Sequence, residues 1–168
     1  SLHARGSTVQ TRCVYAVLRK TDVDSGVLLQ IWDYLAWALN ALARGRLPDR
    51  DWRGKKLPLG VAGRVIGNGM RAACVQLRGD WEFYASCVGF PTWNQDRFCW
   101  VCGASTVVHD PLLFTNGSAD APWRDTIRSH EDYIADLGRS GKPLPGLFNF
   151  LTLRLEGVTI DVLHAVDQ

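Results

Sequence analysis

The sequence has no long apolar run and few cysteines, and each absence excludes a class of protein. The longest apolar stretch, at about 27–43, is interrupted by Gln30, Asp33 and Asn40, so we expect no membrane-spanning segment and no membrane partner. The first residues include no apolar segment of signal-peptide length. Because only five of the 168 residues are cysteine, a secreted disulfide scaffold is not expected, and we infer a reducing, intracellular environment.

The chain also lacks the strong positive charge that is usual in dedicated nucleic-acid-binding modules. It has 19 Lys and Arg residues against 17 Asp and Glu residues, which gives a net charge of +2. This charge permits contact with nucleic acid without arguing for it. The cations that cluster at 44–56 are the place where we would expect phosphate contacts, and the alternative is a solvated loop.

The remaining composition is that of a globular protein. Hydrophobic residues make up 46% of the chain and charged residues 21%, and the length suits a single domain spanning 1–168. Seven tryptophans are many for this length, and they favour either a large core or a partner surface. Neither end of the sequence has an obvious cap or polar tail, so we expect a fragment of a longer core.

Hydrophobic patterns along the chain predict a mixture of helices and strands, with an α/β (or α+β) fold and no clear βαβ series. The predicted strands are 11–18, 27–31, 72–77 and 151–163. The predicted helices are 35–43, ending at Gly45, 81–88, and 123–137, ending at Gly138. The residues from 91 to 109 are expected to be irregular.

Cys99 and Cys102 form a CxxC pair followed by Gly103, and this pattern favours half of a zinc site. A tight turn of this length presents both sulfur atoms to one point, and Zn²⁺ prefers thiolate ligands. A redox pair is the main alternative, although such a pair usually begins a helix. Two further ligands are needed, and spacing alone does not choose among the candidates, which are His109, His130, and Asp161 with His164.

Asp80 follows an apolar segment and Gly79, a position at which carboxylates often bind ligands or metal ions in open α/β sheets. Carboxylates there could hold Mg²⁺ for phosphoryl transfer, provided that several acids converge. The alternative is structural, because Asp is a favoured N-cap residue and a helix is predicted from Trp81. No signature of a cysteine–histidine hydrolase surrounds Cys74 or Cys87.

Taken in order, Gly79-Asp80, the CxxC pair nineteen residues after Asp80, and the distant Asp161-x-x-His164 motif resemble the DDE-type cut-and-paste transposases. The resemblance is to the groups related to CACTA, Transib and the V(D)J recombinase core. It spans about 71–167, and the runs at 79–83, 99–104, 121–124 and 161–167 are also similar to transposon-derived eukaryotic proteins.

The resemblance implies a partial RNase H-like core with a zinc-stabilised insertion at 91–167. Asp80 would be the second catalytic acid, and Asp33 is the best-placed first acid, in competition with Asp22 and Asp24. The structural zinc would be held by a set of four residues, namely Cys99, Cys102, Asp161 and His164. Mg²⁺ would bind only at an intact acidic site.

The downstream glutamate of these families is not found in the sequence, so we expect no strand cleavage by this chain alone. The expected role is that of a transposase-derived, DNA-related domain, with DNA as its partner and a location in the nucleus. The alternative is a zinc-stabilised structural or protein-interaction subunit of a larger complex.

Overall fold

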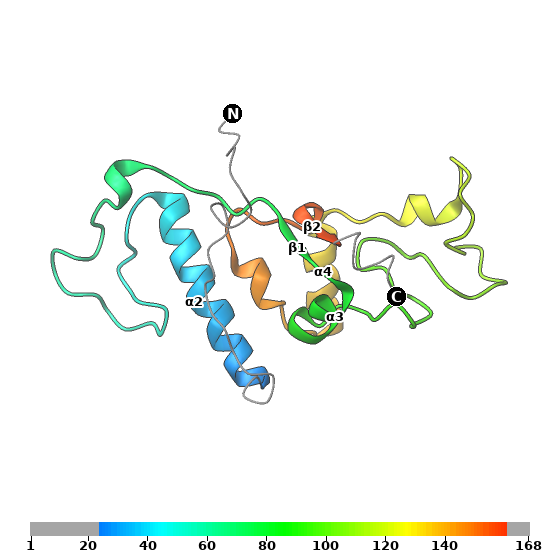
Figure 1. Cartoon of the computed structure of the whole chain (residues 1–168), viewed down its shortest axis with the longest axis horizontal. Coiled ribbons are helices and arrows are strands. Elements are labelled where there is room, and N and C mark those ends of the chain that lie inside the picture. Colours follow the sequence, from blue (N-terminus) through cyan, green and yellow to red (C-terminus); the bar gives the residue numbers. More distant parts are fainter. Residues whose placement is uncertain (1–23, 161–168) are drawn as a thin grey trace, which may run out of the picture.

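The structure, a computed structural model, describes residues 24–160 (Figure 1). Helices and a small sheet alternate with long loops and short 3-10 turns, so the mixed α and β content predicted from the sequence is confirmed at this level. The main elements are α2 (Ser25–Arg44), β1 (Leu77–Gly79), α3 (Trp81–Phe83), α4 (His130–Ser140) and β2 (Val158–Ile160). None of the helices in the described range is long and apolar enough to cross a membrane.

Helix α2 is one continuous helix, so the strand predicted at 27–31 is wrong. Asp24 caps its first turn by accepting a hydrogen bond from the Val27 N–H, and Gly45 ends it in the left-handed conformation at φ 68°. The apolar side chains of 27–31 have the same helical spacing as those of the following turns. The helix therefore begins before them, directly after its N-cap residue Asp24. The helix end predicted at Gly45 is confirmed. The strand predicted at 11–18 lies outside the described residues.

The sheet of the described chain has two short parallel strands. Leu77 pairs with Val158 and Gly79 with Ile160. Both strands are shorter than predicted, and 72–76 has no regular secondary structure and is mostly exposed rather than a buried strand. In 151–157 the chain forms turns, through which Leu153 and Leu155 become buried without the alternation of a strand.

The helix predicted at 81–88 is present as α3 followed by a π-helical turn at Tyr84–Val88. Tyr84 is fully buried, and its hydroxyl lies 2.9 Å from the Leu77 carbonyl oxygen and 2.8 Å from the Thr159 carbonyl oxygen. One side chain thereby joins both strands to the core. The core around Tyr84 is strongly aromatic, and its large members include Trp32, Phe90, Trp100, Tyr133, Phe148 and Phe150.

Helix α4 begins later than predicted, because two local signals stop a helix from forming at 123–129. Pro122 opens a separate 3-10 turn at Pro122–Thr126, and Ser129 then forms a capping box with Asp132. The helix ends at Gly141 instead of Gly138. The irregular structure expected between 91 and 109 is confirmed.

Two loop regions lie at opposite ends of the elongated molecule (Figure 1). We call residues 44–71, which begin at the last residue of α2, the basic arm. The loops between α3 and α4 form the other end and carry the CxxC pair. The helices and the sheet lie between these ends, and they fix where each loop region begins and ends.

Candidate functional site

Cys99 and Cys102 lie in a turn that neighbouring segments hold from both sides. The Gly103 N–H donates to Thr126 Oγ1 over 2.7 Å, and the Arg128 N–H donates to the Val101 carbonyl over 2.9 Å. An Arg128 guanidinium nitrogen also donates to the Trp100 carbonyl over 3.0 Å. The backbone around both thiols is therefore fixed by the segment that leads into α4.

The two thiols are close enough to influence each other. Burial, followed by the neighbouring Cys99 thiol, raises the pKa of Cys102 to about 11, although a backbone hydrogen bond at Ala104 and the charge of Arg128 act in the opposite direction. A redox-active CxxC pair usually begins a helix, whereas this pair lies in an irregular turn. A metal ion bound here would have to displace the protons of both thiols.

An open cavity of about 410 Å³ lies beside the pair and is lined by both cysteines, Arg97 and Arg128. Two thiolates supply half of a tetrahedral zinc site. Among the residues that the structure describes, no cluster of three or more His, Cys, Asp or Glu side chains could complete it. Asp161 and His164, the predicted remaining ligands, lie outside the described residues.

The other two histidine candidates have environments that do not involve the cysteine pair. His109 is exposed in a turn. His130 is half-buried at the start of α4, where its Nδ1 accepts a hydrogen bond from the Leu155 N–H over 3.1 Å. Its ring also packs edge-on against Phe148 at 5.2 Å between centroids. We therefore assign His130 a structural role.

Asp80 lies at the carboxyl end of β1, as predicted, and its carboxylate caps α3. Asp80 Oδ1 accepts a hydrogen bond from the Phe83 N–H over 2.6 Å. The preceding glycine also has a structural explanation, since a Cβ atom on Gly79 would lie 2.6 Å from the Phe83 ring. The Gly-Asp pair is therefore explained by local packing and capping without a catalytic role.

Asp33, the predicted first acid, is exposed on α2. The competing candidate Asp24 caps the same helix, and Asp22 lies outside the described residues. The described residues contain no group in which Asp33 and Asp80 join a third metal-ligating side chain. A two-metal site needs such convergence of acids.

The basic arm carries a strong excess of positive charge. It holds eight basic and two acidic residues, whereas the rest of the chain holds eleven basic and fifteen acidic residues. All eight cations are exposed, and they are Arg44, Arg46, Arg50, Arg53, Lys55, Lys56, Arg64 and Arg71. None of them forms a salt bridge within residues 24–160, because the salt bridges found there all lie between 97 and 156.

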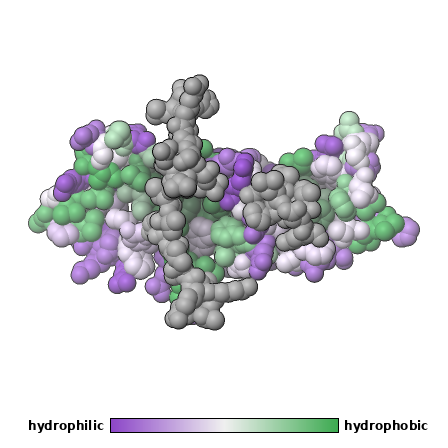
Figure 2. Space-filling view, in the orientation of Figure 1, coloured by the Kyte–Doolittle hydropathy of each residue, from purple (hydrophilic) through white to green (hydrophobic). Residues whose placement is uncertain are grey.

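Backbone pairing folds the arm on itself, and contacts of Trp37 and Tyr34 hold it against α2. Arg46 pairs with Val65 and Arg50 with Lys56 in isolated antiparallel bridges. The Trp37 indole N–H donates to the Arg50 carbonyl over 2.8 Å. The Trp52 ring packs edge-on against Tyr34 on α2, at 6.0 Å between centroids. The cations are therefore presented on a folded loop, and Figure 2 shows hydrophilic and hydrophobic residues side by side at this end of the molecule.

Comparison of the chain with protein-family models, with curated proteins and with solved structures finds no match. The resemblance to transposases therefore depends on the sequence motifs alone, and functional conclusions depend on the residues described above. The sequence identified the cysteine pair and the first half of the arm. It did not indicate that Thr126 and Arg128 would hold the cysteine turn, because twenty-four or more residues separate them from Cys102 along the chain.

Proposed function

We propose that this chain is a transposase-derived, DNA-binding domain that does not cleave DNA strands by itself. The observation that carries the proposal is the basic arm, where eight exposed cations stand against two carboxylates on one folded loop. Lys and Arg side chains of this kind contact phosphate oxygens and release the counterions of duplex DNA.

The uneven charge distribution supports the same proposal. The net charge of the whole chain is only +2, but the arm contributes +6 and the remainder −4. A polyanion is therefore attracted to one end of the molecule and repelled by the rest, so the field orients it on the arm. Contacts to the phosphate backbone carry no sequence information, so binding through the arm is independent of DNA sequence.

The proposal includes a structural zinc ion held by Cys99 and Cys102 together with Asp161 and His164. The geometry near the end of β2 supports this ligand set. Ile160 pairs with Gly79, and the ring of Trp81 lies 5.5 Å from the ring of Trp100, next to Cys99. The chain thus reaches residue 160 on the side of the core that carries the cysteine turn.

The absence of strand cleavage is proposed from the acids themselves. The Asp80 carboxylate is used by the N-terminus of α3, and Asp33 lies exposed on α2. Two metal ions about 4 Å apart need several carboxylates that converge on one point. We therefore propose no Mg²⁺-dependent step for this chain alone.

A second candidate function is that of a zinc-stabilised interaction subunit. The observation in its favour is Trp93, whose side chain is 63% exposed. Exposed tryptophans are common at binding hot spots. Three other tryptophans, Trp32, Trp37 and Trp52, are buried or half-buried in the fold. Zinc binding without any DNA affinity would favour this second function.

The DNA-binding proposal is tested by measuring the affinity for a short duplex at several salt concentrations. We expect the logarithm of the association constant to fall linearly with the logarithm of the salt concentration. In Lys55→Gln/Lys56→Gln the slope should decrease by about 0.9 for each phosphate that the variant no longer neutralises. Fluorescence anisotropy with duplexes of two unrelated sequences would measure the slope and show whether binding is independent of sequence.

The matched control is Arg78→Gln/Arg124→Gln, which also removes two exposed cations, both outside the arm. We expect this control to bind DNA as the unmodified chain does. An equal loss of affinity in the two double variants would contradict the assignment to the arm, and no measurable affinity at low salt would contradict DNA binding altogether.

A further inference from the structure

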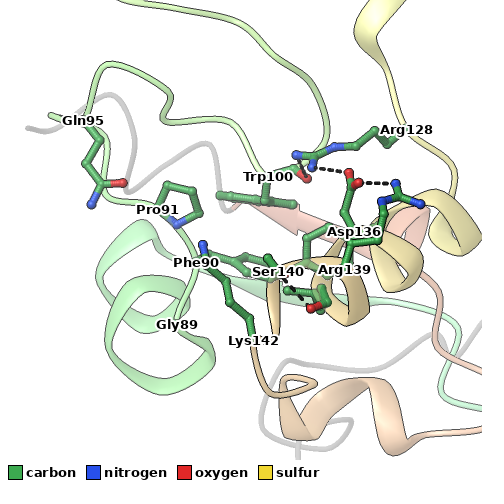
Figure 3. Close-up of a pocket in the computed structure, with 12 residues that line it drawn as sticks. Gly89, Phe90, Pro91, Gln95, Trp100, Arg128, Asp136, Arg139, Ser140 and Lys142 are labelled. Atoms are coloured by element: carbon green, nitrogen blue, oxygen red, sulfur yellow. Dashed lines mark hydrogen bonds and ion pairs between the residues drawn. The ribbon is translucent and has the colours of Figure 1, made fainter.

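An open cavity of about 650 Å³ lies between α4 and the segment that leads into the cysteine turn (Figure 3). Its wall includes the aromatic side chains of Phe90, Trp100 and Tyr133, which are 4%, 5% and 8% exposed. The rings of Phe90 and Trp100 are stacked, with centroids 4.8 Å apart. The wall therefore belongs to the packed core of the protein.

Three cations and one carboxylate border this cavity. Figure 3 shows Arg128 and Arg139 pointing at the carboxylate of Asp136 from opposite sides. Lys142 also lines the cavity, and its ammonium group has no partner within the described part of the chain. The border thus carries two positive charges in excess, so an anion of charge −2 would neutralise it.

Two buried hydrogen-bond donors belong to residues that line the cavity and have no acceptor in the described part of the chain. Across residues 24–160, two buried side-chain polar atoms lack a hydrogen-bond partner, and they are Trp100 Nε1 and Arg128 Nε. Both atoms carry a proton to donate, and both residues line this cavity. A buried donor without an acceptor is unfavourable, so the site gains from a ligand that supplies acceptor oxygens.

We propose that this cavity binds a phosphate monoester of about the size of a mononucleotide. Guanidinium groups match phosphate oxygens in a bidentate way, and a phosphate monoester supplies both the charge and the acceptors that the border lacks. The volume lies within the range of known small-ligand sites. The organic part of the ligand would lie against Pro91 and the aromatic wall. The inference does not depend on DNA binding by the arm, none of whose residues lines this cavity.

The test uses the side-chain N–H signals of the ¹⁵N-labelled full chain, since Trp indole and Arg Nε protons give separate resonances. Inorganic phosphate and thymidine 5′-monophosphate are titrated at constant ionic strength. We expect the Trp100 Nε1 and Arg128 Nε signals to shift together and to saturate at the same ligand concentration. The monophosphate should bind more tightly than phosphate because it also contacts the wall.

Variants distinguish a site from general ionic attraction. Lys142→Gln and Arg139→Gln should each weaken binding by about tenfold, as expected for one charge-assisted hydrogen bond. Lys56→Gln, which removes an exposed cation in the arm, should leave the affinity unchanged. Shifts that grow linearly without saturation, or that are the same in Lys142→Gln, would overturn the proposal.

A final comparison separates the two sources of such a phosphate. A short duplex with a 5′-terminal phosphate is titrated beside the same duplex without it. Saturable shifts of both signals with the phosphorylated duplex alone would assign the cavity to a DNA end. Tighter binding of the free monophosphate would assign it to a nucleotide-like metabolite. If Lys55→Gln/Lys56→Gln loses DNA affinity but keeps the shifts of both signals on titration with the free monophosphate, the two sites are separate.

Discussion

Asp80 illustrates how one residue fits both a catalytic and a structural interpretation. Its position after β1 is where carboxylates bind ligands in α/β sheets, and its side chain accepts the Phe83 N–H at the start of α3. An N-cap satisfies one of the unpaired donors of a helix. The capping interaction is what the structure shows, and it gives a measurable prediction.

We expect Asp80→Ala to lower the free energy of unfolding by about 1 kcal/mol, because the first turn of α3 loses its cap. Asp80→Asn should cost much less, since asparagine is an equally good N-cap residue. Urea denaturation of the two variants in metal-free buffer measures both values. An equal loss in the two variants would show that the carboxylate charge matters and that capping does not explain Asp80.

Among the elements, α2 approaches the turn at Gly146–Asn149 so closely that a side chain at Gly146 would clash. A Cβ atom on Gly146 would lie 2.5 Å from Trp32 Cβ and 2.8 Å from Trp32 Cγ. Asn40 on the same helix fixes the approach, since its side chain donates to the Asn149 carbonyl over 2.9 Å and accepts from the Leu151 N–H over 2.7 Å. Packing of α2 therefore depends on a glycine outside the helix.

Two glycine-to-alanine variants should accordingly change stability in opposite directions. Gly146→Ala should destabilise the protein by roughly 1–3 kcal/mol, because the added methyl group overpacks the contact with Trp32. Gly138→Ala, in the exposed last turn of α4 with no atom within 4 Å of the added Cβ, should stabilise it by roughly 0.5–1 kcal/mol. Thermal unfolding of both variants measures the difference.

A change of the same sign in the two variants would contradict this account of the α2 contact. The comparison is matched, because each variant adds one methyl group to a glycine that does not need a positive φ. Only the space around the added Cβ differs between the two sites.

At the scale of the whole molecule, the cations of the basic arm form no salt bridges within the described chain, whereas cations near the cysteine pair are matched by carboxylates. The salt bridges of the described chain include Arg97 with Asp110 near the cysteines, and Arg154 with Glu131 near the start of α4. The cations of the arm have no such partners in residues 24–160. This separation is why a small net charge is compatible with a strongly basic surface.

The proposed zinc site would connect distant parts of the whole chain, and metal analysis of variants tests it. We expect one zinc ion per purified chain, with loss of the metal in both Cys99→Ser and His164→Ala. His109→Ala should retain zinc, because His109 is exposed in a separate turn. Inductively coupled plasma mass spectrometry gives the metal content.

His130→Ala is the stability control for this experiment. It should lower the unfolding temperature, because the Leu155 N–H loses its acceptor, while the zinc content stays the same. Zinc lost in Cys99→Ser but retained in His164→Ala would contradict the proposed ligand set. Absence of zinc from the unmodified chain would contradict the zinc site as a whole.

The sequence predicted the elements whose signals are local. The end of α2 at Gly45, the helical turns after Asp80 and the irregular cysteine region all follow from caps, periodicity and turn residues within a few positions. The strand predicted at 27–31 was wrong because a short apolar run fits either a strand or a helix, and the cap at Asp24 lies upstream of it. The helix predicted at 123–137 began too early, because the apolar spacing from Trp123 continues past Ser129, where the helix actually begins.

The sequence by itself determined the chemistry that is available, including two thiols three positions apart, an excess of cations at 44–71 and an aspartate after an apolar segment. Only the tertiary structure decided how these groups are used. It brought Arg128 to the cysteine turn, gave the Asp80 carboxylate to α3 and left the cations of the arm exposed. The physical reason is that burial, hydrogen-bond partners and charge pairing depend on residues far apart in the chain, which local patterns do not specify.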